Sequence, residues 1–360
     1  MVAAESGVLW VPRVHWGLFI ATYLFLGGVS GGSYVTSVTA QLLQGRTTDE
    51  TETRSRGETA RWGAILAIAA IAIGTGALLY HLGAPLRALT FAWNFSNYGS
   101  WLVIGTWLIV LFSVLATVDA IWLLFGSDKK GATGGSYVPR RVLGWLTVGG
   151  NPVLVRTLDY FADTTRPPER YHLLLRVFGA LLGLGVIVYT SMLLSDLWTC
   201  PLWNRTYLPP LFLMSGVSTG LAATVAMPTI FDGLTETVHQ YSLADDALIV
   251  VELGILGSFY LVLQGSSNCL ASQASVEALN SVFSMPFWVG VVGLGLVSPL
   301  ALSLLMTGTA RVWSLDERSQ TWHSIFRAGY VLKYGLVLVG GFFLRYVVIF
   351  AAVKLPLTVV

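Results

Sequence analysis

The chain has 360 residues, of which 54% are hydrophobic and only 11% are charged, and its mean hydropathy is +0.69. An ordinary soluble domain carries about 25% charged residues, and a folded chain of this size buries only about three quarters of its surface. The composition therefore excludes a water-soluble enzyme. A net charge of only +2 does not indicate the basic surface that a nucleic-acid partner requires. Two cysteines are too few for a four-thiolate iron–sulfur cluster.

Long apolar segments predict an all-α integral membrane protein. A transmembrane helix requires about 20 mostly apolar residues, and each segment here is much longer than a strand of a membrane barrel. We predict eight spans, at residues 14–43, 62–82, 100–125, 172–197, 207–231, 246–266, 284–308 and 326–352.

Two connecting segments are distinctive. Residues 44–61 are polar and of mixed charge, so we expect a solvated loop there. Residues 126–170 form the longest connection, and its middle part is moderately apolar. Glycines and a proline interrupt this part, which favours a helix on the membrane surface over a ninth span.

The basic residues are distributed unevenly between the two sides of the membrane. With eight spans, both termini lie on one side, which holds four Lys and Arg residues, whereas the other side holds fourteen. Because cytoplasmic loops are enriched in Lys and Arg, we expect both termini outside and loop 126–170 in the cytoplasm, with the protein in the inner (plasma) membrane of the cell. We expect no cleavable signal, since Arg13 follows rather than precedes any apolar stretch.

A short motif recurs in the two halves of the chain. The sequence Gly-Val-Ser-Gly-Gly at 28–32 reappears as Gly-Val-Ser-Thr-Gly at 216–220, an offset of 188, and Trp101 and Trp288 are offset by 187. This similarity predicts two parallel four-helix bundles, in residues 1–200 and 201–360. Chance similarity between apolar sequences is the alternative.

Polar residues near the predicted outer face suggest a quinone site. His81 ends the second span, and Arg87 follows after a glycine and a proline that turn the chain. A histidine beside an arginine can bind and protonate a carbonyl oxygen; interfacial packing with a snorkelling arginine is the alternative. Tyr189 and Asp196 lie two turns apart on one face of the fourth span, so they can donate a hydrogen bond and accept a proton. An ordinary packed tyrosine is the alternative.

Three ionisable residues inside the spans are candidates for a proton pathway, because such residues are costly in a membrane. Asp119 and Glu252 lie toward the inner side, where they can carry a proton, cap a helix or meet the water layer. Arg345 either pairs with an acid such as Asp196 or faces a wet cavity. No span carries a pair of charges near its middle, which argues against a secondary transporter.

We expect neither haem nor metal. A membrane haem needs two histidine ligands from facing helices, and only His15 and His81 could meet, with His15 almost in the headgroup zone. Cys200 and Cys269 lie in predicted outer loops. They can form a disulfide there or remain two free thiols.

Several motifs together resemble the NrfD family, typified by the membrane subunit of polysulfide reductase. The motifs are Tyr-Leu-Phe-Leu-Gly-Gly at 23–28, His-Leu-Gly-Ala-Pro-Leu-Arg at 81–87 with Ser-Trp at 100–101, Tyr-Thr-Ser at 189–191 with Pro-Leu-Trp-Asn at 201–204, Phe-Trp at 287–288, and Gly-Gly-Phe-Phe-Leu-Arg at 340–345. Their order and spacing extend over essentially the whole sequence.

The resemblance implies eight helices in two bundles, without haem or metal, and a quinone bound near the outer face by His81, Arg87 and Tyr189. It also implies docking, on that face, to an iron–sulfur subunit of four-cluster ferredoxin type. This subunit in turn serves a catalytic subunit, often a molybdopterin enzyme. Members of the polysulfide reductase type use an Asn and a His in the first helix as well, and this sequence has no matching pair there.

The sequence thus predicts a quinone- or quinol-binding membrane subunit of a respiratory oxidoreductase complex, with no redox cofactor of its own. It would exchange electrons between menaquinone or ubiquinone in the membrane lipid and the iron–sulfur partner. The candidate quinone ligands are His81, Arg87, Tyr189, Asp196, His15 and Tyr23. A secondary transporter, or a membrane anchor without a quinone site, is the alternative.

Overall fold

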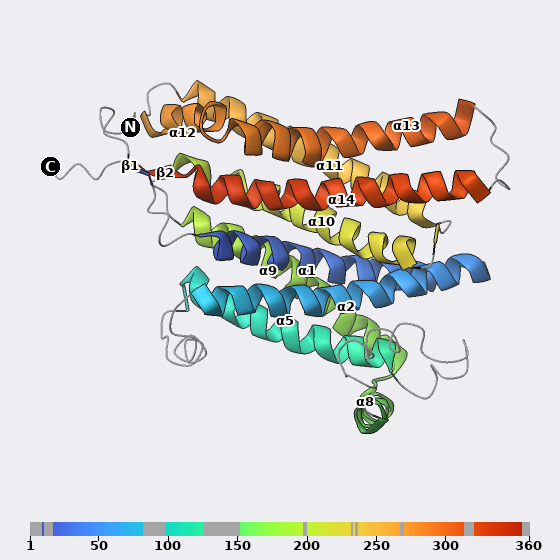
Figure 1. Ribbon diagram of the computed structural model, residues 1–360. Helices are drawn as coiled ribbons and strands as arrows, with labels where there is room; N and C mark the ends of the chain where they lie inside the picture. Colours follow the sequence, from blue (N-terminus) through green and yellow to red (C-terminus); the bar gives the residue numbers. More distant parts are fainter. Residues whose placement is uncertain are drawn as a thin grey trace.

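The computed structural model describes residues 9–10, 17–81, 98–125, 152–196, 200–231, 233–234, 237–266, 270–312 and 320–354. Eight helices in these ranges are long and apolar enough to cross a membrane, which confirms the predicted all-α membrane fold. They lie side by side along one common direction (Figure 1). Seven spans are α-helices: α1 (Leu18–Gln44), α2 (Glu50–His81), α5 (Trp101–Leu124), α9 (Glu169–Ser195), α10 (Leu208–Phe231), α11 (Thr237–Gly265) and α14 (Gln320–Phe350).

The remaining span changes its helical form along its length. It begins as a π-helical segment, η3 (Met285–Val297), and continues as α13 (Ser298–Val312). The shorter elements are β1 (Leu9–Trp10), α8 (Pro152–Thr165), the 3-10 helix η2 (Pro201–Trp203), α12 (Leu270–Asn280) and β2 (Val353–Lys354). Helix α8, from the long connection between the third and fourth spans, lies crosswise to the spans and is seen almost end-on in Figure 1.

The two ends of the described chain meet. Strand β1 pairs with β2 in antiparallel orientation, with Leu9 opposite Lys354 and Trp10 opposite Val353. Both termini therefore lie at one end of the helical bundle (Figure 1), as an even number of spans requires. The placement of that end outside the cell stays a prediction.

Glycines bring α1 and α10 into backbone contact. A Cβ atom on Gly32 would lie 2.2 Å from the carbonyl oxygen of Gly216, and one on Gly220 would lie 2.3 Å from the carbonyl carbon of Gly32. Such distances leave no room for any side chain. Because lipid provides no hydrophobic drive between helices, small residues of this kind allow the close van der Waals packing that holds them together.

Helix α2 begins much earlier than the hydropathy predicted. Residues 50–61, expected as part of a solvated loop, form its first three turns, so that expectation is wrong. The polar residues there find partners on the beginning of α11: the hydroxyls of Ser55 and Thr237 lie 2.5 Å apart, and Arg56 donates to Gln240 at 3.2 Å. Both Ser55 and Arg56 are buried, so tertiary contacts rather than apolar composition extend the helix.

The helix contacts of the two halves correspond. In the first half α1 packs against α2 and α9, and α5 packs against α9; in the second half α10 packs against α11 and α14, and η3 packs against α14. The contacts across the centre also correspond, because α1 touches α14 and α10 touches α9. This is the pairing that the repeated motif leads one to expect. The division into two bundles at residue 200 stays a prediction.

Candidate functional site

The first half contains a buried pair of tyrosine hydroxyls. The Oη atoms of Tyr23 on α1 and Tyr189 on α9 lie 2.7 Å apart, and the residues are 1% and 2% exposed. The sequence named both residues as candidate quinone ligands, and the structure brings them together. Either hydroxyl can donate to the other, so the pair always retains one O–H that can be offered to another acceptor.

Glycines on the two neighbouring helices leave room for these rings. A Cβ atom on Gly105 of α5 would lie 1.8 Å from Cε2 of Tyr189, inside the ring's own volume. On α2, a Cβ atom on Gly74 would lie 3.7 Å from Cδ2 of Tyr23, an ordinary contact. All four spans of the first half therefore converge on the tyrosine pair.

His81 lies at the same end of the bundle but nearer its rim. It is the last residue of α2 and is half-buried. Its ring centroid is 6.4 Å from that of Phe19, near the beginning of α1. Seven helical residues, or about 10 Å along the axis, separate it from Gly74 beside Tyr23. His81 thus lies between the tyrosine pair and the end of the bundle where the termini meet.

Of the other predicted ligands, the structure describes only Asp196. Asp196 is exposed at the end of α9. Arg87 and His15 lie outside the described residues. Cys200 is buried, and Cys269 also lies outside the described residues, so the possible disulfide stays a prediction.

Asp119 is the centre of a second buried cluster, near the opposite end of the first half. Its Oδ1 receives His172 Nε2 at 3.0 Å and Arg176 Nε at 2.9 Å, while Tyr34 donates to Oδ2 at 3.1 Å. The Asp119 side chain is 3% exposed, so it does not meet the water layer. Asp119 stood out in the sequence, whereas its partners were not predicted, although His172 and Arg176 are four residues apart on one helix face.

Arg345 and Glu252 lie together in the core of the second half. Arg345 is fully buried on α14 and donates to the Ser215 hydroxyl and, at 3.2 Å, to the Gly341 carbonyl. The acid that interacts with it electrostatically is Glu252 on α11, which also neighbours Ser215. The suggested partner Asp196 is instead exposed on another helix.

A third buried ionic cluster, around Lys333, was not among the predicted sites. Lys333 on α14 is fully buried, and its Nζ lies 2.7 Å from Asp246 Oδ1 and 3.7 Å from Asp245 Oδ2. Ser218 donates to the other oxygen of Asp245 at 2.7 Å. Charge pairs within the membrane are therefore formed between spans rather than within one. Lys333 lies inside the predicted span 326–352, and a charged residue within a span was the signal that could have revealed this cluster.

The two halves can be placed in register by their helix contacts. Between α1 and α9, Gly31 packs against Gly183, and between α10 and α14, Thr219 packs against Gly341. If these two contacts are matched, a residue of α1 corresponds to the residue of α10 that is 188 positions later (31 to 219). A residue of α9 likewise corresponds to the residue of α14 that is 158 positions later (183 to 341).

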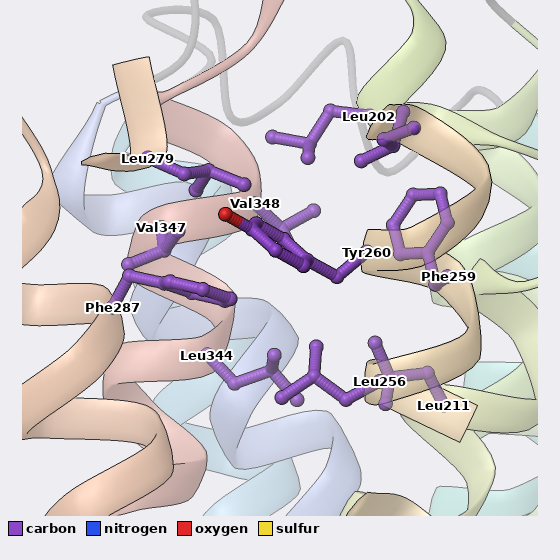
Figure 2. Close-up of a pocket in the computed structure, with 11 residues that line it drawn as sticks. Leu202, Leu211, Leu256, Phe259, Tyr260, Leu279, Phe287, Leu344, Val347 and Val348 are labelled. Atoms are coloured by element: carbon purple, nitrogen blue, oxygen red, sulfur yellow. The ribbon is translucent and has the colours of Figure 1, made fainter. Parts of the chain in front are cut away.

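In this register the tyrosine pair has an apolar counterpart. Tyr23 corresponds to Leu211, and Tyr189 corresponds to Val347. Both of these residues line one pocket with Leu256, Phe287 and other apolar side chains, and Figure 2 shows them around the ring of Tyr260. The free volume is about 20 Å³, roughly that of one water-sized sphere. The hydroxyl pair is thus a feature of the first half alone at these corresponding positions.

Comparison with known proteins agrees with this architecture. The protein is 28% identical over 304 residues to a Wolinella succinogenes protein named as one chain of polysulfide reductase, and the match extends over 81% of this sequence and 83% of that protein. It is 27% identical over 300 residues to a Haemophilus influenzae protein named NrfD homolog, covering 82% and 85% of the two sequences. Protein NrfD of Escherichia coli is 28% identical over 298 residues, covering 80% and 83%.

The family model described as polysulphide reductase, NrfD, matches residues 10–356. This match extends over nearly the whole sequence and includes all eight spans. It confirms the resemblance drawn from the sequence motifs, so this chain belongs to the NrfD family of membrane subunits.

Proposed function

We propose that this protein binds a quinone or quinol in the first half, at the tyrosine pair, and transfers its electrons to or from a partner subunit. The observation that carries the proposal is the pair of buried hydroxyls of Tyr23 and Tyr189, where the corresponding positions of the other half are Leu211 and Val347. If these positions only had to pack helices together, apolar side chains such as Leu211 and Val347 would be sufficient. Buried hydroxyls are retained where a polar group has to be recognised.

The chemistry follows from the residues that the protein supplies. A quinol that is oxidised releases two electrons and two protons, and a quinone that is reduced takes them up. The O–H of the tyrosine pair donates to a quinone oxygen and holds the head group in place. His81, between the pair and the rim, accepts or returns a proton at a ring nitrogen. Arg87 adds positive potential near the bound head group, and Asp196, exposed at the end of α9, exchanges the proton with water.

The electrons need an acceptor in another subunit. Each described cluster consists of side chains that hold protons and charge, and a relative of this protein is named as one chain of polysulfide reductase. We therefore propose a four-cluster ferredoxin-type iron–sulfur partner on the outer face of the inner membrane, serving a catalytic subunit, often a molybdopterin enzyme. Menaquinone and ubiquinone both fit the proposal.

The buried ionic groups are proposed proton carriers. Glu252 and Arg345 interact electrostatically in the core of the second half, and Asp119 lies near the end opposite the tyrosine pair. Charge pairs between spans also keep the secondary transporter open as a second candidate, because such pairs mark ion paths in membrane proteins. Uptake of an ion into proteoliposomes without any redox donor would favour that candidate.

The test is a titration of the purified protein with a fluorescent quinol analogue. We expect saturable quenching for the wild type, and weaker binding by at least tenfold for Tyr189→Phe and for His81→Ala. Tyr160→Phe is the control, because it removes an exposed tyrosine hydroxyl from α8, at the other end of the bundle. Absence of saturable binding, with partner subunits present, would refute the quinone site and favour a membrane anchor.

A further inference from the structure

A groove of about 310 Å³ runs along the surface between α5 and α9. Its walls are almost entirely apolar, and only its end near Asp119 is polar. The lining residues are Leu111, Val114, Leu115, Val118, Asp119 and Trp122 from α5, and Leu175, Phe178 and Leu182 from α9.

This groove opens toward the lipid. Of the eight spans, α5 has the smallest buried share, so its outer side forms part of the boundary between protein and bilayer. Val114 is 61% exposed and Phe178 is 52% exposed at the mouth of the groove. The groove is therefore continuous with the surface that lipid covers, and hydrocarbon rather than water meets its opening.

The groove has the length of one leaflet. Leu111 and Trp122 are eleven helical residues apart, which is about 16 Å along the axis. Half of a hydrocarbon core of about 30 Å is about 15 Å. In the last turn of α5, Trp122 Nε1 donates to Thr165 Oγ1 of α8 at 2.9 Å. Tryptophans concentrate at the membrane–water interface, so this end of the groove should lie at that level.

Positive charge lies at that same end. Arg166 directly follows Thr165 and is exposed. The side chain of Arg176 is 13% exposed beside Asp119. A lipid whose acyl tail follows the groove would bring its phosphate to this level, where arginine binds phosphate through charge-assisted hydrogen bonds.

We propose that the groove binds one acyl chain of a bilayer phospholipid, with the phosphate near Arg166 and Trp122. The acyl chain would cover the side of the Asp119 cluster that faces the bilayer and keep water from its carboxylate. The Asp119 side chain is only 3% exposed and is held by three donors, so the acyl chain would complete the apolar cover of a site that is already desolvated.

Native mass spectrometry of the detergent-purified protein, reconstituted with phosphatidylglycerol, tests this proposal. We expect one tightly retained phospholipid on the wild type and at least tenfold lower occupancy on Val118→Trp, which fills the groove. Leu304→Trp is the control, since Leu304 is 74% exposed on α13, outside the groove. Arg166→Gln should weaken retention of phosphatidylglycerol several-fold. Equal retention by Val118→Trp and the wild type would overturn the proposal.

A second measurement does not depend on a bulky variant being folded. A photo-reactive benzoylphenylalanine introduced at Val114, at the mouth of the groove, should give a covalent adduct with phospholipid after a detergent wash. The same group at Leu304 should give little adduct after that wash. An apolar tail in the groove could belong to a phospholipid or to a quinone, so a parallel sample contains a menaquinone analogue. An adduct with the quinone in place of phospholipid would overturn the lipid assignment.

Discussion

Gly105 on α5 determines where the ring of Tyr189 can lie. A Cβ atom there would be 1.8 Å from Cε2 and 2.2 Å from Cδ2 of the tyrosine, so the ring occupies the space that a side chain would take. The hydroxyl contact with Tyr23 depends on this placement, because both side chains are buried and have little freedom to adjust. A residue with no side chain of its own thus positions the proposed ligand.

Gly105→Ala should displace Tyr189 and lower quinol turnover of the assembled complex by at least tenfold. Overpacking of this kind costs about 1–3 kcal/mol of stability, which thermal denaturation in detergent would measure. Gly254→Ala is the matched control, because a Cβ atom there meets nothing within 4 Å. Unchanged turnover in Gly105→Ala would show that the position of Tyr189 is unimportant.

Tyr23→Phe and Tyr189→Phe should each lower quinol turnover, and their effects should not add. Each substitution removes one partner of the 2.7 Å contact, and the other hydroxyl is then left buried, at a cost of about 1–3 kcal/mol. The double variant removes both hydroxyls and should be no less stable than either single variant. Strictly additive losses in binding and stability would mean that the two hydroxyls act independently.

Asp119→Asn should destabilise the protein strongly. The substitution leaves Arg176 and His172 beside a neutral group in a buried site, and breaking a buried pair costs about 3–5 kcal/mol. Arg54→Gln breaks the pair with Glu58 from its exposed side, because the Arg54 side chain is 70% exposed and Glu58 keeps its interaction with Arg61; it should cost about 0–1 kcal/mol. Equal melting temperatures for the two variants would contradict a structural role for the Asp119 cluster.

Lys333→Met should be rescued in part by a second substitution. The single variant leaves Asp245 and Asp246 without the buried cation that lies between them, so a loss of about 3–5 kcal/mol is expected. Adding Asp246→Asn removes one of the two unpaired charges and should recover part of that loss. A double-mutant cycle in unfolding free energy measures the coupling, and a coupling of zero would mean that the contact contributes nothing.

Reporter fusions can test the orientation of the bundle. Because β1 and β2 pair, both termini are at one end of the molecule, and the distribution of Lys and Arg predicts that this end is outside. Alkaline phosphatase fused to the C-terminus should be active, and a cytoplasmic fluorescent reporter fused there should be dark. The reverse pattern would place the proposed quinone site at the cytoplasmic face.

The spans were predictable because hydrocarbon sets their length and composition. Helix boundaries outside the apolar core were not: the polar turns at 50–61 are helical because Ser55 and Arg56 find partners on α11, 182 and 184 residues away in sequence. Hydropathy averages over a window and does not record such partners. The π-helical form of η3 likewise has no sequence signal that we recognised.

The candidate site was predictable residue by residue but not as an arrangement. Tyr23 and Tyr189 were identified from motifs, yet their contact depends on how α1 and α9 cross. The ionic clusters show the same limit. Asp119, Glu252 and Arg345 stood out as charges in apolar sequence, whereas their partners became evident only with the helices packed.

The glycine contact between α1 and α10 also restricts how this protein can move. A hinge needs side chains that can change rotamer or a loop that can change its dihedral angles, and two backbones in direct contact offer neither. We therefore expect hinge motions during turnover in the peripheral spans, such as α5 and α13, rather than at the α1–α10 contact. Tyr23 lies on α1, so the glycine contact would help to keep the proposed quinone site in a fixed position relative to α10.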